Sequence, residues 1–155
     1  MTTVLPATFI YSSSEIELHY KRPLFQKMIH ITGLKDAENV LRKYIHPNRI
    51  DFKECFWVIL LTNANRLIGI AEIASGHPHQ TCVPIREIFQ LAFATNSVNL
   101  IISHNHCSGN LTPSKADKDL TQRLATCCKW FGMNLLDHII ITSESYTSFV
   151  AEDLI

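Results

Sequence analysis

A run of seven apolar residues at positions 55–61, CFWVILL, constrains the fold of this chain more than any other feature. An unbroken apolar run of this length, rich in β-branched and aromatic side chains, is typical of a strand that is covered on both faces. A turn signal at residues 63–65 and a second apolar segment at 67–74 then predict a β-hairpin over residues 55–74. We therefore expect a sheet with helices packed on both sides.

Helical periodicity separates the predicted strands along the chain. A helix of about three turns is predicted to begin at Leu34 and to end before Pro47, and Pro84 is a typical first residue of another helix. A third helix is expected to follow Ser114 and to end at Gly132. Further strands are expected at residues 98–102, 135–142 and 146–150. This order of elements predicts an α+β fold with a mixed, mostly antiparallel sheet flanked by helices.

The first 33 residues follow a different pattern and are predicted to form an N-terminal extension to a compact domain at residues 34–155. Apolar and polar residues alternate over 15–21, which indicates a half-buried edge strand, and residues 25–32 are expected to form a second strand. The two strands would make a hairpin or an arm. Whether this extension holds a partner subunit in a homodimer or closes the sheet stays open at this point.

Composition restricts the classes of function. Fourteen basic residues balance fourteen acidic ones, which argues against an extended nucleic-acid surface because non-specific DNA binding depends on Lys and Arg. No secretory leader opens the chain, and no apolar run approaches the ~18 residues that a membrane span needs. The five cysteines form no CxxC pair and are expected to be reduced. We therefore expect a cytoplasmic protein without a membrane segment.

Residues 98–117, VNLIISHNHCSGNLTPSKAD, carry the strongest chemical signal. Residues two apart on a strand point to the same side, so His104 and His106 can present both imidazoles to one point. Asp117 follows in the first turn of the predicted helix, where the positive end of the helix favours an anion. Two imidazoles and one carboxylate are a typical catalytic zinc set, which keeps a fourth position for water.

These and neighbouring residues also have other interpretations. Ser114 and Asp117 also fit a capping box, in which each satisfies a backbone group at the start of a helix. A second His-X-His at residues 77–79 is a rival site, although no carboxylate follows it at ligand spacing. His138 lies among apolar residues and is expected to be a hydrogen-bonded core residue or a support for a ligand. The thiol of Cys107 either fills the loop or perturbs the metal.

The spacing His104-X-His106, seven further residues, Ser114, two more and Asp117 resembles the signature of the JAMM (MPN) metalloprotease family. The segments HNHCSGNLTPSKAD and LLDHIII are similar to those of its RadC-like branch, and the resemblance covers about residues 34–155. It implies a three-layer α/β/α domain. Cys107 is a departure, since this branch usually has proline there. The residues that match the family's functional positions are the zinc ligands His104, His106 and Asp117, the oxyanion support Ser114, and the glutamate of an earlier strand, Glu54.

The resemblance implies a zinc-dependent hydrolase of the metallopeptidase type, with one Zn²⁺ per chain and an unidentified peptide or protein substrate, in which an isopeptide bond is one option. Glu54 would accept a proton from the attacking water and return it to the leaving amine. The interpretation requires that the strands carrying Glu54 and His104 run antiparallel. The alternative is a non-catalytic RadC-like module linked to DNA repair or mobile elements. A zinc nucleobase deaminase is set aside because its HxE and PCxxC signature is missing.

Overall fold

The computed structural model describes residues 20–76 and 83–155. Within these residues the chain forms one five-stranded sheet with the strand order β2-β1-β3-β4-β5. Strands β1 and β2 form the predicted antiparallel hairpin, and β1 also pairs antiparallel with β3. Strands β3 and β4 are parallel and are joined by a helix, whereas β5 returns antiparallel to β4. The strands are β1 (Glu54–Leu61), β2 (Leu67–Gly76), β3 (Asn99–Asn105), β4 (Asn134–Ile141) and β5 (Tyr146–Ser148).

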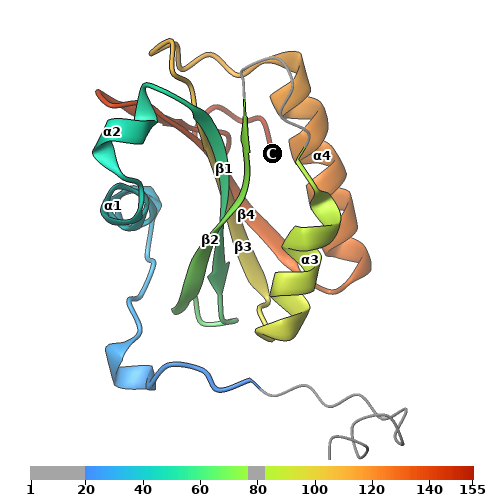
Figure 1. Ribbon diagram of the computed structural model, residues 1–155. Helices are drawn as coiled ribbons and strands as arrows, with labels where there is room; N and C mark the ends of the chain where they lie inside the picture. Colours follow the sequence, from blue (N-terminus) through green and yellow to red (C-terminus); the bar gives the residue numbers. More distant parts are fainter. Residues whose placement is uncertain (1–19, 77–82) are drawn as a thin grey trace, which may run out of the picture.

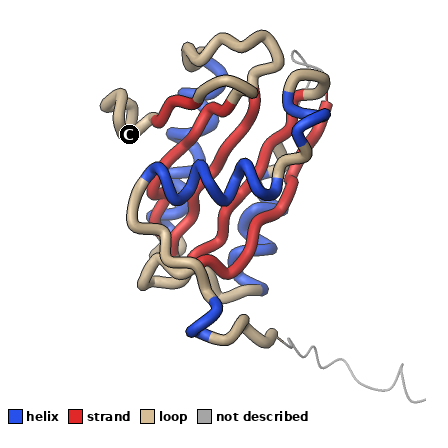
Figure 2. Tube along the Cα trace, turned by 90° about the vertical axis from the view of Figure 1, so that its left-hand side faces the viewer, coloured by secondary structure: helices blue, strands red, loops and turns tan. Residues whose placement is uncertain are grey.

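Helices cover both faces of this sheet and confirm the predicted three-layer α+β arrangement (Figure 1). Helices α1 (Leu34–Tyr44) and α2 (Pro47–Ile50) lie on one face, and α1 crosses in front of the strands in Figure 2. Helices α3 (Ile85–Ala94) and α4 (Lys115–Trp130) lie on the other face. The helices therefore cover both faces of the sheet.

The apolar run of β1 divides its side chains between two hydrophobic cores, because successive residues of a strand point to opposite faces. Trp57 and Ile59 belong to the core beneath α1 and α2, whereas Phe56 and Val58 belong to the core beneath α3 and α4. Seven of the eight strand residues are buried. Strand β1 is therefore central to both cores, as its sequence predicted.

The N-terminal extension differs from the prediction in the part that the structure describes. Residues 25–32 do not form a strand; they contain the 3₁₀ turn Phe25–Lys27 and a single bridge between His30 and Arg66. The buried side chains of Met28 and Ile31 are three residues apart, a spacing that the two-residue period of a strand does not give. The Ile31 N–H donates a hydrogen bond to the Asn65 carbonyl and so connects this segment to the turn just before β2. The strand predicted at 15–21 falls almost wholly outside the described residues.

No helix among residues 20–76 and 83–155 is both long and apolar enough to cross a membrane.

Candidate metal centre

The end of β3 and the first turn of α4 bring three potential metal ligands together. His104 lies inside β3, which extends to Asn105 and so is longer than the predicted strand, and His106 follows directly. Their Nε2 atoms are 2.9 Å apart. Asp117 Oδ1 lies 3.3 Å from His104 Nε2, and Asp117 Oδ2 lies 3.8 Å from His106 Nε2. Within the described part of the chain these residues form the group suited to a metal ion.

The two histidines are held in different surroundings. His106 Nδ1 lies 2.6 Å from the Asn110 carbonyl oxygen, which can only accept, so this nitrogen carries the proton and donates. In its neutral form His106 therefore presents an Nε2 lone pair to His104 and Asp117. His104 is buried, its ring stacks with that of Phe56, and burial lowers its pKa to about 4 although the Asp117 charge raises it. His104 is therefore neutral near pH 7, as a metal ligand must be.

Asp117 closes the capping box and faces the histidines at the same time. Its Oδ2 accepts hydrogen bonds from the backbone N–H and the hydroxyl of Ser114, at 2.7 and 2.6 Å. In return, Ser114 Oγ accepts from the Asp117 N–H at 3.1 Å. The cap therefore orients the carboxylate and leaves Oδ1 toward His104. Since the hydroxyl proton of Ser114 is directed to Asp117, its oxyanion role stays a prediction.

The geometry of the three residues fits zinc. With zinc–ligand bonds of roughly 2.0–2.1 Å, the ligand atoms of a tetrahedral site lie about 3.3 Å apart. The two Nε2 atoms are 2.9 Å apart and His104 Nε2 lies 3.3 Å from Asp117 Oδ1, and one ligand atom from each of the three residues lies within 4.8 Å of the other two. Two imidazole nitrogens and one carboxylate oxygen are also a donor set that zinc accepts. These residues can therefore hold zinc after small side-chain adjustments.

Glu54 begins β1 at the end of the sheet that carries the histidines. Strands β1 and β3 are antiparallel, as the catalytic interpretation requires, with Phe56 directly opposite His104. Glu54 precedes Phe56 by two residues and so shares its face, and continuing the register places it across from His106. Its side chain is partly exposed. Glu54 therefore lies on the same face and at the same end of the sheet as the proposed ligands.

His138 and Cys107 lie beside the cluster. His138 is fully buried in β4, its ring stacks on Phe149 at 4.4 Å between ring centroids, and its Nε2 lies 2.8 Å from His104 Nδ1. Burial lowers its pKa well below the ordinary range. Cys107 is half-buried, and its thiol pKa is raised by burial and by the nearby Glu54 charge. His138 thus contacts a proposed ligand directly.

Two residues of this region were not identified from the sequence, Asn105 and Thr121. Asn105, between the two histidines, points to the opposite face and is fully buried. Its Oδ1 accepts from the Cys55 N–H at 2.7 Å, and its Nδ2 donates to the carbonyls of Ile50 and Lys53 at 2.6 and 2.8 Å. These bonds fix the backbone on both sides of Glu54. The strand period could have shown which way Asn105 points, but not what it meets.

Thr121 lies one helical turn after Asp117 and is 1% exposed. Its hydroxyl lies 2.6 Å from His138 Nδ1 and donates to the Asp117 carbonyl at 2.6 Å. The four-residue spacing from Asp117 could have placed it on the buried face of the helix. Nothing local indicates its contact with His138, which is seventeen residues away in the sequence.

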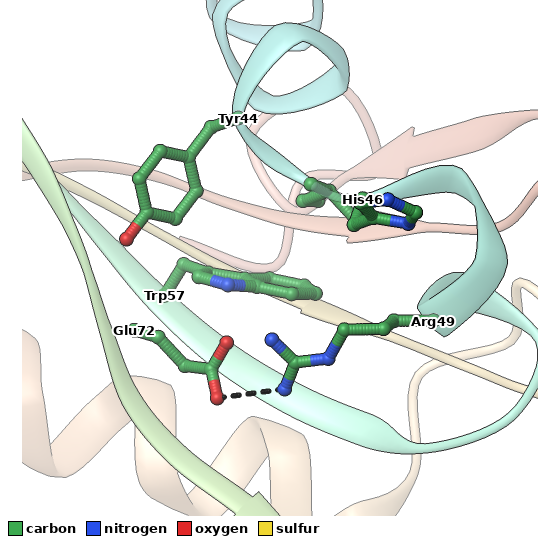
Figure 3. Close-up of a pocket in the computed structure, with 6 residues that line it drawn as sticks. Tyr44, His46, Arg49, Trp57 and Glu72 are labelled. Carbon is green, nitrogen blue, oxygen red and sulfur yellow. Dashed lines mark hydrogen bonds and ion pairs between the residues drawn. The ribbon is translucent and has the colours of Figure 1, made fainter.

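A separate pocket of about 190 Å³ lies on the opposite face of the sheet, under the end of α1 (Figure 3). Arg49 and Glu72, which line it, form an ion pair of 3.0 Å, and Trp57 of β1 lines it beside them. It contains none of the proposed ligands. The rival histidines at residues 77 and 79 lie outside the described residues. The remaining lining residues are Tyr44, Ile45 and His46.

Comparison with known proteins agrees with these features. A family model described as a RadC-like JAB domain matches residues 31–154. A UPF0758 protein of Flavobacterium johnsoniae is 34% identical over 148 residues, which cover 96% of this chain and 63% of that protein. A UPF0758 protein of Haemophilus ducreyi is 41% identical over 132 residues, which cover 85% of this chain and 59% of that protein. The chain thus spans about three fifths of these curated relatives, whose names state no activity.

Proposed function

Because the chain belongs to the RadC-like JAB domain family, we propose that it is a zinc-dependent hydrolase of the metallopeptidase type. The observation that carries this proposal is the convergence of His104, His106 and Asp117, whose ligand atoms lie within 4.8 Å of one another at one end of the sheet. Zinc held by these three residues would keep a further position open for water. The proposal assigns one Zn²⁺ to each chain.

Zinc bound by three protein ligands lowers the pKa of a coordinated water from ~15.7 toward ~7 and so supplies a nucleophile at neutral pH. The chain's own residues hold the ligands in place: the Asn110 carbonyl orients His106, and the capping box orients Asp117. Phe56 and Phe149 shield His104 and His138 from solvent, because their rings pack against these imidazoles. These contacts orient the proposed ligands in the absence of substrate.

Glu54 is proposed as the general base. It would accept the proton of the attacking water and then give it to the leaving amine, so that its carboxylate is regenerated at the end of the reaction. Ser114 would turn its hydroxyl from Asp117 toward the substrate and donate to the oxyanion. A donor in this role contributes on the order of 3 kcal/mol to transition-state stabilisation.

The proposed substrate is a peptide or protein, with hydrolysis at an amide or isopeptide bond. The curated relatives extend well beyond the matched region, so substrate choice by the whole protein is part of the proposal. We place the reaction in the cytoplasm, in keeping with the free thiols of Cys55, Cys107, Cys127 and Cys128. The alternative is a RadC-like binding module that holds zinc without catalysis.

The experiment compares wild type with Glu54→Gln after zinc reconstitution. Zinc per chain is measured by elemental mass spectrometry, and cleavage is measured on a proteome-derived peptide library and on isopeptide-linked peptides. Both proteins are expected to bind one zinc, and only wild type is expected to cleave, with cleavage lost after chelation. Full cleavage by Glu54→Gln would refute the role of Glu54. Zinc binding without cleavage by either protein would favour the binding module.

A further inference from the structure

A continuous chain of hydrogen bonds joins two of the proposed ligands through the protein interior. It runs from His104 Nδ1 to His138 Nε2 over 2.8 Å and from His138 Nδ1 to Thr121 Oγ1 over 2.6 Å. It ends 2.6 Å further on, at the backbone carbonyl of Asp117. We propose that Thr121 is a positioning residue that acts through His138 to keep His104 in the tautomer that binds metal. This proposal rests on the proposed zinc site.

The last acceptor in this series of hydrogen bonds, the Asp117 carbonyl, determines which atom donates in each of them. The Asp117 carbonyl can only accept, so the hydroxyl of Thr121 donates to it. A hydroxyl has one proton, so Thr121 Oγ1 must accept from His138 Nδ1–H. In neutral His138 the other nitrogen, Nε2, is then an acceptor. His104 Nδ1 therefore donates to His138, which leaves the lone pair of His104 on Nε2.

This assignment places the His104 lone pair where the ligand cluster needs it. His104 Nε2 is the atom that lies 2.9 Å from His106 Nε2 and 3.3 Å from Asp117 Oδ1. Reversing the tautomer of His138 would direct its Nε2–H at His104 Nδ1 and move the His104 proton to Nε2. That proton would occupy the direction in which metal binds. The Thr121 hydroxyl thus selects between a form of His104 that binds metal and one that does not.

A purely structural role for Thr121 is the competing explanation, since threonine in a helix often donates to the carbonyl four residues earlier. Thr126 makes this bond in the same helix, to the Gln122 carbonyl at 2.8 Å, and is only half-buried. Thr121 differs because it is 1% exposed and also accepts from an imidazole that is fully buried. Without the hydroxyl, His138 Nδ1–H would be left without a partner in the interior, which favours the reversed tautomer.

Thr121→Val tests this role, because valine keeps the shape of the side chain and removes the hydroxyl. Zinc affinity is measured by competition with a colorimetric chelator, and the imidazole tautomers of the metal-free protein are measured by ¹⁵N NMR. We expect Thr121→Val to weaken zinc binding by roughly 10- to 100-fold, the usual cost of disturbing the hydrogen bonds that orient a metal ligand, transmitted here through His138. The metal-free variant should show the His104 proton on Nε2.

Two further variants separate this role from folding. Thr121→Ser restores the hydroxyl and should restore wild-type zinc affinity and tautomers, whereas Thr126→Val removes an equivalent helix bond and should leave both unchanged. Wild-type affinity and tautomers in folded Thr121→Val would overturn the proposal, and so would an equal loss in Thr126→Val. If wild type binds no zinc, the proposed function fails, but the NMR spectra of the metal-free proteins still decide whether Thr121 sets the His104 tautomer.

Discussion

Replacing Asn105 by leucine should destabilise the fold strongly, because this fully buried amide makes three hydrogen bonds to backbone groups. Leucine has a similar size but can neither donate nor accept. The carbonyls of Ile50 and Lys53 and the N–H of Cys55 would lose their partner, and each unpaired buried group costs about 1–3 kcal/mol. The expected loss is therefore at least about 3 kcal/mol, against a total stability of about 5–15 kcal/mol for a domain.

Urea unfolding of the metal-free protein, followed by circular dichroism, measures this loss. Asn48→Leu is the matched control: Asn48 is exposed, and its side chain makes no hydrogen bond within residues 20–76 and 83–155. The control should change the free energy of unfolding by no more than about 0.5 kcal/mol. A loss below about 1 kcal/mol in Asn105→Leu, with an unchanged denaturant slope, would refute the claim that Asn105 holds the start of β1.

Three further changes are expected to have smaller effects on stability. Ser103 Oγ is buried with no hydrogen-bond partner in the described part of the chain, so Ser103→Ala should stabilise the protein by about 1 kcal/mol in urea unfolding; destabilisation would contradict this. The turn closed by Gly109 N–H to the His106 carbonyl places Cys107 at its second position, where proline is favoured. Cys107→Pro should therefore raise the melting temperature or leave it unchanged, and a clear decrease would show that proline does not fit the turn. Burial raises the pKa of Asp137, so its carboxylate opposes folding as pH rises from the unfolded-state pKa through the folded-state pKa. Asp137→Asn should consequently gain stability relative to wild type as pH rises above the ordinary aspartate pKa of about 3.9, and a pH-independent difference would exclude this effect.

The sequence predicted the central features of the fold because each pattern there is typical of only one kind of secondary structure. The apolar run of β1 indicated a strand covered on both faces, and its residues do divide between two cores. Strand β3 was predicted too short because His104 and Asn105 are polar. The structure accommodates them through the Phe56 ring and through the backbone groups that Asn105 binds. Tertiary partners of this kind are invisible in a local pattern.

The candidate site likewise contains residues that a local sequence pattern could place and residues that it could not. His104, His106 and Asp117 could be placed together because their spacing is set by one strand end and one helix start. Asn105 and Thr121 could not be identified, since the groups they contact lie up to 55 and 17 residues away in the sequence. In the N-terminal extension the strand predicted at 25–32 is wrong, because a 3₁₀ turn and a single bridge stand in its place.

Zinc K-edge X-ray absorption of the zinc-loaded chain tests the central claim most directly, because it reports which atoms surround the metal. Ligation by His104, His106 and Asp117 predicts nitrogen and oxygen neighbours at about 2.0–2.2 Å, with imidazole scattering from two histidines and no sulfur. A sulfur neighbour near ~2.3 Å would show that a thiol, such as that of Cys107 directly after His106, has replaced a proposed ligand. That result, or a protein that takes up no zinc at all, would contradict the account.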